Sequence, residues 1–360
     1  MIIARTPYRL SFFGGGTDYP AWFHREGGAV LSTTIDKYCY VSVRHLPPFF
    51  SNKHRVVWSH VEAIQSISEI LHPAVREGLR MFDFGDDHGL EIHHQGDLPA
   101  RAGMGSSSAF AVGFLQALAA YRGQMIDKHE LALRAVELEQ SRLNENVGTQ
   151  DQFAAAYGGL NTIEFRPGGE IRVDPVTVAP ERIRELERHL LLFYTGTSRL
   201  SSDVAADVVA NLGQRREVLL RMRSMVGQAV ALLNSSEDLA EFGRMLHEAW
   251  SLKRKLSTRI ASATVEEVYR KAMRAGALGG KLLGAGSSGF MVFYVPERRQ
   301  DAVRRTLSSY LQVPFGFESE GSRIIYYGSR APEVMADAPQ TPRATTRRRS
   351  NVAASSRASL

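Results

Sequence analysis

The sequence predicts a two-domain protein that mixes strands and helices. Its 360 residues are more than one small hydrophobic core usually holds, and 44% hydrophobic with 23% charged residues is ordinary for a globular chain. Near residue 185, extended segments give way to long helical patterns. We therefore expect an N-terminal domain over residues 1–185, a C-terminal domain over 186–330 and a separate tail over 331–360.

The expected elements follow from hydrophobic spacing and from the positions of glycine and proline. Apolar residues that alternate or run together between turn residues predict strands at residues 2–13, 28–45, 90–94, 161–165, 190–194, 281–283, 290–295 and 315–327. Apolar residues in helical register predict helices at 60–82, 111–121, 128–143, 150–157, 202–234, 238–257, 266–275 and 298–311. Pro47 and Pro48 end the second strand, and Gly148 separates two of the helices.

Charge and cysteine content exclude several classes of protein. Residues 331–360 contain five arginines and two carboxylates, so this tail carries +3 of the net charge of +6, and it has almost nothing to bury. We expect it to be disordered and solvated, with no nucleic-acid partner. The single Cys39 excludes an intrachain disulfide. No apolar run reaches the roughly 20 residues that cross a bilayer, and the start at Met1 lacks a signal-peptide pattern, which favours a cytoplasmic protein without a membrane partner.

A loop rich in glycine and serine leads into the helix expected at 111–121. It consists of Gly103, Met104, Gly105, Ser106, Ser107 and Ser108. Glycine permits a tight turn with uncovered N–H groups, and a helix that starts at the serines points its free N–H groups and positive dipole end into that loop. Such a loop binds phosphate, and its hydroxyls can add hydrogen bonds or ligate magnesium. A serine-rich helix cap is the alternative, but two glycines and three serines together favour phosphate binding.

Other residues suited to chemistry lie around the first strand and the helices near Gly148. Gly14, Gly15 and Gly16 precede Thr17 and Asp18, and Arg9 lies in the strand ahead of them; a simple linker is the alternative. Asp151 lies in the first turn of a helix, where the dipole stabilises a carboxylate by about 0.3–1 kcal/mol. Glu139 lies on the preceding helix, where carboxylates are usually part of a solvated face.

A third glycine-rich loop has the spacing of a dinucleotide-binding motif. Gly284, Gly286 and Gly289 match Gly-x-Gly-x-x-Gly, which must open a helix in order to bind a dinucleotide. The residues that follow, 290–295, are a predicted strand. We therefore expect a hairpin here and not an NAD site.

The three loops, in this order, resemble the motifs of the GHMP small-molecule kinases, which include galactokinase, homoserine kinase and mevalonate kinase. The serine loop is similar to Pro-x-x-x-Gly-Leu-Gly-Ser-Ser, with Met104 in place of leucine. The segment from Arg9 to Tyr19 is similar to Arg-x-x-x-x-Gly-Glu-x-Thr-Asp-Tyr, with Gly15 in place of glutamate, and the segment from Lys281 is similar to Lys-x-x-Gly-Ala-Gly-x-Gly-Gly. The resemblance implies an α+β N-terminal domain joined to a ferredoxin-like C-terminal domain, with the site between them.

The resemblance also implies roles in an ATP-dependent phosphoryl transfer. The serine loop would hold the ATP phosphates, Arg9 would offset charge on the moving phosphoryl group, and Asp151 would accept or orient the acceptor's proton. Magnesium would sit on Ser107 and Glu139, although an alignment without gaps places Gln140 at the metal position, and both stay open. Substrate binding would fall to Gly15, Gly16, Thr17 and Asp18, and support of the phosphate loop to Gly284 and Gly286.

Within the family, residues 9–20 and 145–152 are most similar to kinases that phosphorylate the anomeric hydroxyl of D-glycero-D-manno-heptose 7-phosphate for bacterial surface polysaccharide. A fucokinase-like sugar 1-kinase and a non-catalytic, metabolite-sensing relative are the alternatives, and a homodimer is left open. A 7-phosphate adds about two negative charges. Residues 195–199 offer hydroxyls, a glycine N–H and Arg199 to bind it, while a helix cap with an exposed arginine is the structural alternative.

Overall fold

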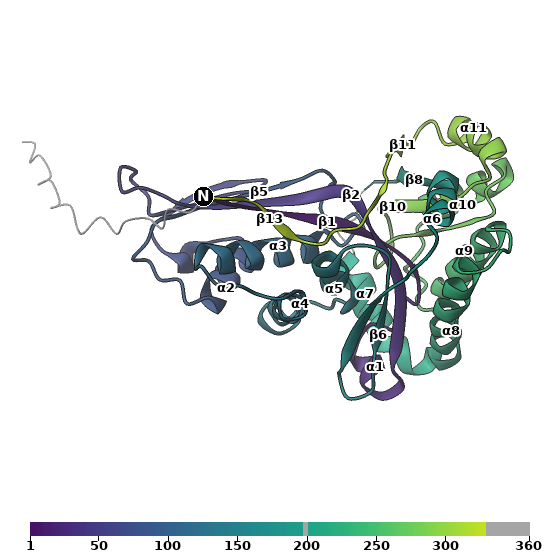
Figure 1. Cartoon of the computed structure of the whole chain (residues 1–360), viewed down its shortest axis with the longest axis horizontal. Coiled ribbons are helices and arrows are strands. Elements are labelled where there is room, and N and C mark those ends of the chain that lie inside the picture. The colour runs from purple at the N-terminus through teal and green to yellow at the C-terminus, as the bar shows by residue number, and fades with distance from the viewer. Residues whose placement is uncertain (197–200, 329–360) are drawn as a thin grey trace, which may run out of the picture. The chain divides into compact units, whose positions relative to one another are not determined.

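The computed structural model describes residues 1–196 and 201–328, and Met1–Gly328 forms one compact unit (Figure 1). The predicted basic tail at 331–360 and Arg199, the predicted ligand of the acceptor's phosphate, lie outside the described residues. In the part of the chain that the structure describes, no helix is long and apolar enough to cross a bilayer.

A nine-stranded sheet is built around two long strands. β1 (Ile2–Phe13) and β2 (Gly28–His45) pair antiparallel from Ile2 opposite Val43 to Phe13 opposite Leu31. The main path runs β13-β1-β2-β5-β3-β4, while β6 and β12 pair with β2, and β7 pairs with β6. The remaining strands are β3 (His54–Val57), β4 (Val61–Ile64), β5 (Leu90–Gly96), β6 (Asn161–Phe165), β7 (Ile171–Pro175), β12 (Phe317–Glu318) and β13 (Arg323–Tyr327).

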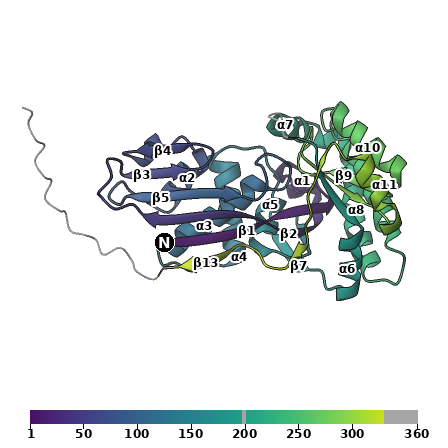
Figure 2. The same cartoon turned by 90° about the horizontal axis from the view of Figure 1, so that it is seen from above.

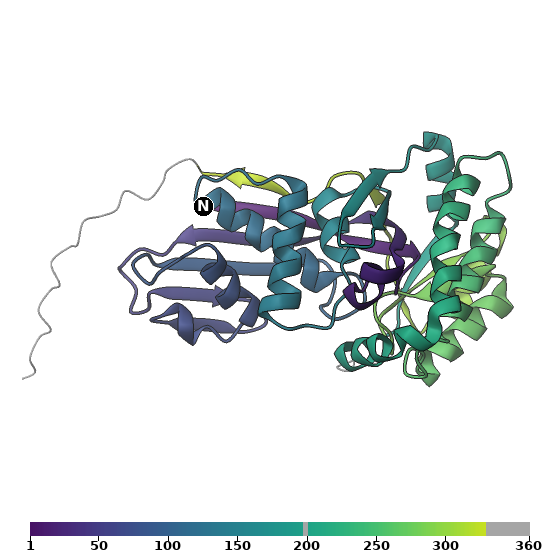
Figure 3. The same cartoon turned by 90° about the horizontal axis from the view of Figure 1, so that it is seen from below.

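Helices cover one face of this sheet. α3 packs against both β1 and β2, with α2, α4 and α5 beside it, and Figure 3 shows these helices in front of the strands, whereas Figure 2 shows the opposite face. Eleven of the sixteen residues of α3 are buried, so it is a core helix and not an amphipathic surface helix. The helices are α1 (Pro20–Glu26), α2 (Pro73–Met81), α3 (Ser106–Tyr121), α4 (Lys128–Val136) with a π-helical continuation Glu137–Arg142, α5 (Gln150–Tyr157) and α6 (Pro180–His189).

The prediction of one helix over residues 60–82 was wrong for its first half. β4 pairs antiparallel with β3 at these residues, and only α2 is an α-helix. Pro73 explains where α2 begins, because proline suits the first helical turn and disfavours the helical conformation in the residue before it. Tertiary pairing therefore outweighed a helical spacing of apolar residues.

A second, four-stranded sheet has the strand order β11-β8-β10-β9. Numbered along the chain, this is fourth-first-third-second with antiparallel neighbours, which is the ferredoxin-like arrangement. The predicted fold class is thereby confirmed. The strands are β8 (Leu190–Tyr194), β9 (Gly279–Leu282), β10 (Phe290–Tyr294) and β11 (Leu311–Gln312); the helices are α7 (Ser201–Asn211), α8 (Arg216–Leu233), α9 (Ala240–Lys253), α10 (Ala263–Ala275) and α11 (Glu297–Thr306).

Two features of chain order position the site. β9 and β10 form an antiparallel hairpin across the loop with Gly284 and Gly286, as predicted, so this loop does not open a helix. After β11 the chain returns to the first sheet, where β13 pairs with β1 and β12 with β2. The segment 186–330 is therefore not confined to the second sheet, and the predicted boundary near residue 185 stays a prediction.

Truncation after Gly328 is expected to leave the protein folded. Residues 331–360 have almost no apolar side chains to bury, and β13 already completes the edge of the first sheet. The melting temperature of the truncated chain, measured by differential scanning calorimetry, should equal that of the full chain. A clear drop would mean that the tail contributes buried contacts.

Candidate active site

The serine loop joins the first sheet to the start of α3, as the sequence predicted. Gly103 and Gly105 have φ values of 83° and 72°, and Gly105 is the N-cap of the helix without a side-chain cap. The first-turn N–H groups of Ser106, Ser107 and Ser108 therefore receive no side-chain cap from the N-cap residue, and no acidic side chain lies in that turn. An open helix N-terminus of this kind favours an anion.

The hairpin loop after β9 packs against the serine loop at van der Waals distance. A Cβ atom added at Gly284 would lie 2.4 Å from the Cα of Gly103, and one added at Gly103 would lie 2.4 Å from the carbonyl oxygen of Leu283. Phe290 N–H also donates to Ala102 O at 3.0 Å. Neither glycine can be replaced without moving the backbone. The two loops can therefore approach this closely only with glycine at both positions.

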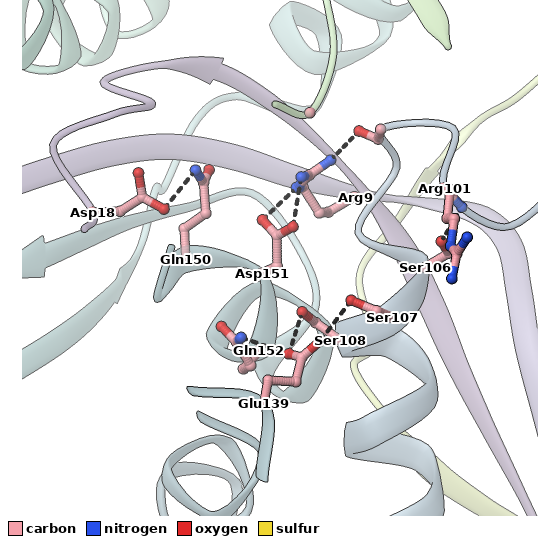
Figure 4. A network of polar contacts seen from close by, with 12 residues as sticks. Arg9, Asp18, Arg101, Ser106, Ser107, Ser108, Glu139, Gln150, Asp151 and Gln152 are labelled. Atoms are coloured by element: carbon pink, nitrogen blue, oxygen red, sulfur yellow. Dashed lines mark hydrogen bonds and ion pairs between the residues drawn. The ribbon is translucent and has the colours of Figure 1, made fainter. Parts of the chain in front are cut away.

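Arg9 connects the serine loop to Asp151 (Figure 4). Its Nε and Nη2 donate to the two carboxylate oxygens of Asp151 at 2.7 and 2.6 Å, and its Nη1 donates to Gly103 O at 2.6 Å. The side chain of Arg9 is 5% exposed and that of Asp151 is 22% exposed. A bidentate pair this buried has defined geometry as well as charge complementarity.

Glu139, and not Gln140, lies beside the serine loop (Figure 4). Its carboxylate accepts hydrogen bonds from Ser107 Oγ at 2.5 Å, Ser108 Oγ at 2.7 Å and Gln152 Nε2 at 2.6 Å. Gln140 instead donates to Val147 O and Thr149 Oγ1. Burial raises the pKa of Glu139 to about 7, although the three hydrogen bonds lower it.

Asp18 forms a second polar cluster with the amide of Gln150. Gly16 N–H donates to Asp18 Oδ1 at 2.9 Å, and Gln150 Nε2 donates to Asp18 Oδ2 at 2.9 Å. Burial, and secondarily the charge of Asp151, raise the pKa of Asp18. Thr17 is fully buried and donates to the carbonyl oxygens of Gly14 and Ala29, so it shapes the loop.

Many of these residues line a cavity of about 510 Å³. Ten of the predicted site residues line it: Arg9, Gly15, Gly16, Asp18, Gly103, Gly105, Ser106, Ser107, Asp151 and Gly284. Five others that the structure describes do not: Thr17, Met104, Ser108, Glu139 and Gly286. Met104 packs in the hydrophobic core, and Gly286 approaches Ile260 behind the loop.

Several lining residues were missed by the sequence analysis. They include Ser11, Gln150, Lys253 and Lys281. Lys253 Nζ donates to the carbonyl oxygens of Leu282 and Gly284 at 2.9 and 2.5 Å, and Lys281 Nζ donates to Phe12 O at 2.8 Å. A lysine near the end of a helix gives no sequence signal of its own, because only the fold brings α9 beside the hairpin loop.

Lys253 is expected to make stability depend on pH. Burial and the neighbouring Arg9 charge lower its pKa from 10.5 to about 7. Between about pH 7 and 10.5 the unfolded chain then binds more protons at this site than the folded chain, so its contribution to the free energy of unfolding rises with pH in that window. We expect chemical denaturation to show that the free energy of unfolding of wild type, minus that of Lys253→Met, increases with pH in this window by up to about 1.4 kcal/mol per pH unit.

The control for this measurement is Lys255→Met, which removes an exposed lysine from the turn that follows α9. It shows what the loss of an exposed ammonium does to the free energy of unfolding over the same pH range. A difference between wild type and Lys253→Met that does not change with pH would contradict the assigned shift.

The chain is similar to proteins of known family. Residues 69–159 match the family model of the GHMP kinase N-terminal domain, and residues 229–312 match that of the GHMP kinase C-terminal domain. The chain is 27% identical over 333 residues to a D-glycero-alpha-D-manno-heptose 7-phosphate kinase of Campylobacter jejuni, covering 89% of this chain and 97% of that protein. It is 26% identical over 307 residues to a bifunctional fucokinase/GDP-fucose pyrophosphorylase of Arabidopsis thaliana, covering 79% of this chain and 29% of that protein.

Among solved structures, the chain is similar to a D-glycero-D-manno-heptose 1-phosphate kinase of Bacteroides thetaiotaomicron. The TM-score is 0.68 at 25% identity, and the match covers 91% of this chain and 100% of that one.

Proposed function

Since this chain belongs to the GHMP kinase family, whose members are ATP-dependent, we propose that it is a sugar kinase that phosphorylates the anomeric hydroxyl of D-glycero-D-manno-heptose 7-phosphate. The product is the 1,7-bisphosphate, used for bacterial surface polysaccharide. One observation carries the proposal: Arg9 holds Asp151 and the serine loop together at the wall of a single cavity. The similarity to a heptose 7-phosphate kinase over nearly the whole of both chains supports the choice of acceptor.

The serine loop and α3 would bind the ATP phosphates. The first-turn N–H groups of Ser106, Ser107 and Ser108 and the positive end of the α3 dipole favour an anion beside Gly105. Arg9, with one guanidinium edge on Asp151 and one nitrogen on Gly103 O, is positioned to offset charge on a phosphoryl group that leaves this loop. Phosphoryl transfer depends mainly on such alignment and charge neutralisation.

Magnesium fits the cluster around Glu139. This carboxylate is 2% exposed and, among the described residues, its partners are hydroxyl and amide groups without a positive charge. Oxygen ligands of this kind suit a small divalent cation bound jointly with phosphate oxygens. Glu139 and Ser107 would hold the ion, since Ser107 Oγ keeps its lone pairs while it donates to Glu139. An ion held by these two residues would supply positive charge against the terminal phosphates.

Asp151 would receive the proton of the acceptor hydroxyl. Each of its carboxylate oxygens accepts one hydrogen bond from Arg9 and retains capacity for another. Because an anomeric hydroxyl is more acidic than an ordinary alcohol, a carboxylate is a sufficient base. Arg9 would also fix the orientation of the Asp151 carboxylate.

A fucokinase-like sugar 1-kinase is the second candidate function. It is favoured by the similarity to a fucokinase over 79% of this chain. Both candidates use the same transfer to an anomeric oxygen, and they differ in whether the acceptor carries a phosphate.

The test is ATP turnover by the purified full-length chain with a panel of acceptors. Heptose 7-phosphate, unphosphorylated heptose, mannose 6-phosphate and L-fucose would be compared by kcat/KM in a coupled ADP assay. We expect heptose 7-phosphate to give the highest value. A preference for L-fucose would favour the second candidate, and a lack of turnover with all acceptors would indicate a non-catalytic relative.

Ser107→Ala and Glu139→Gln are each expected to raise the Mg²⁺ concentration for half-maximal rate about tenfold or more. Each removes one of the oxygen ligands assigned above. The measurement is the initial rate at fixed ATP over a Mg²⁺ titration. Gln140→Ala is the control, since its amide contacts Val147 and Thr149 and not the serine loop. If only the Gln140 variant changed the Mg²⁺ requirement, the metal ligand would be Gln140 and not Glu139.

A further inference from the structure

Two residues that line the cavity each have a buried polar atom without a partner in the described chain. These atoms are Ser11 Oγ and Gln150 Oε1. Ser11 is 6% exposed and Gln150 is 9% exposed, so bulk water does not freely satisfy either atom. A buried polar atom without a hydrogen bond costs about 1–3 kcal/mol, so such atoms in a cavity wall point to a ligand that supplies the missing bond.

The orientation of the Gln150 amide follows from its neighbour Asp18. The amide nitrogen donates to Asp18 Oδ2 at 2.9 Å, and the amide oxygen is left without a partner (Figure 4). Asp18 in turn is held by Gly16 N–H. Gln150 Oε1 is therefore a preoriented hydrogen-bond acceptor.

Ser11 reaches the same place from the end of β1. The pairing of β1 with β2 shifts register between Ser11 and Phe13, and such irregularities re-aim side chains at the ends of strands. Phe12 and Phe13 both turn into the core, where each ring packs edge-on against Phe242. Ser11, the polar residue at this end of the strand, lines the cavity instead.

Gly15 leaves a gap between these two side chains that a Cβ atom would fill. A Cβ atom added there would lie 3.7 Å from Ser11 Oγ and 3.8 Å from Gln150 Nε2, in ordinary van der Waals contact, and Gly15 itself lines the cavity. Its φ is not in the left-handed region, so backbone conformation does not require glycine at this position. Glycine at this position therefore leaves room in the cavity and is not needed for the backbone conformation of the turn.

We propose that Ser11 and Gln150 bind a vicinal pair of hydroxyls on the acceptor, with the acceptor ring placed in the space that Gly15 leaves. One hydroxyl donates to Gln150 Oε1, and its neighbour exchanges a hydrogen bond with Ser11 Oγ. This inference deepens the proposed function and rests on it, since it assigns the specificity of the same acceptor site. In this assignment Ser11 and Gln150 recognise the acceptor, whereas Arg9 and Asp151 act in the transfer of the phosphoryl group.

The test uses variants that cost the folded protein little. Ser11→Ala removes a hydroxyl without a protein partner, and Gly15→Ala adds one methyl group to the gap. Both should keep the wild-type melting temperature, raise the KM for heptose 7-phosphate about tenfold and leave the KM for ATP within about twofold, since a tenfold change corresponds to about 1.4 kcal/mol. Tyr121→Phe is the control: it removes another buried, unpartnered hydroxyl, at the opposite end of α3, and should change neither KM.

A cycle with deoxy acceptors makes the test specific. Wild type should lose kcat/KM with one monodeoxy heptose 7-phosphate in particular, and Ser11→Ala should show no further loss with that analogue. Equal penalties in both proteins, or a KM for ATP that rises together with the acceptor KM, would overturn the inference.

Failure of the proposed function is recognised separately. If the wild type turns over another sugar of the panel, the same variants and the deoxy analogues of that sugar are measured. A selective rise in the KM for that sugar in Ser11→Ala and Gly15→Ala supports the inference, and an unchanged KM overturns it.

Discussion

Replacing Asp151 with asparagine is expected to lower kcat at least about 100-fold, the range for loss of a general base, and to leave the Kd for ATP nearly unchanged. Asparagine keeps the shape of the side chain but carries no charge and is a far weaker base. Arg9 would keep its hydrogen bond to Gly103 O, so the serine loop should retain its position. The measurements are steady-state kcat and equilibrium ATP binding by calorimetry.

The control for that experiment is Asp18→Asn. Asp18 lines the same cavity but contacts Gly16 and Gln150, and not Arg9. It should raise the KM for the acceptor with a smaller effect on kcat. Because Asp151→Asn leaves the 5%-exposed Arg9 with a weakened partner, both variants are assayed well below their melting temperatures. Near-normal kcat in folded Asp151→Asn would remove Asp151 from the chemistry.

Gly284→Ala is expected to destabilise the protein and to weaken ATP binding at least about tenfold, or about 1.4 kcal/mol. Its φ of 71° is costly for alanine, by about 1–2 kcal/mol, and its new Cβ would lie 2.4 Å from the Cα of Gly103. Because the three nearest atoms are all backbone atoms of Gly103, the serine loop itself must move. Urea unfolding and calorimetric ATP titration measure the two effects.

Gly123→Ala isolates the conformational part of that cost. Gly123 has a φ of 67°, almost the same as Gly284, but a Cβ there would meet nothing within 4 Å. The free energy of unfolding of Gly123→Ala should fall only by the cost of the left-handed conformation for alanine, and the variant should bind ATP normally. If the two variants behaved alike, the contact between the hairpin loop and the serine loop would be unimportant for ATP binding.

The sequence predicted individual loops and elements better than it predicted which residues contact them in space. The helix after the serine loop, the strand at 2–13 and the hairpin around Gly284 depend on local patterns of glycine, serine and alternating apolar residues. The structure has each of them, although the helix begins at Ser106 and not at Ala111. The helix over residues 60–82 was wrong because its first apolar residues pair in a sheet with β3. The metal register was left between Glu139 and Gln140, since spacing alone cannot show which of two adjacent side chains meets Ser107.

By itself the sequence determined the α+β class, the GHMP family and the three loops, because each of these depends on residue order over short spans. Only the tertiary structure decided that Glu139 meets Ser107, that Lys253 reaches the carbonyl oxygens of the hairpin loop, and that Ser11 and Gln150 are left without partners beside Gly15. The physical reason is that hydrogen bonding, burial and the pKa of a side chain depend on its neighbours in space, and at this site those neighbours come from β1, α3, α5, α9 and the β9–β10 loop, far apart in the chain.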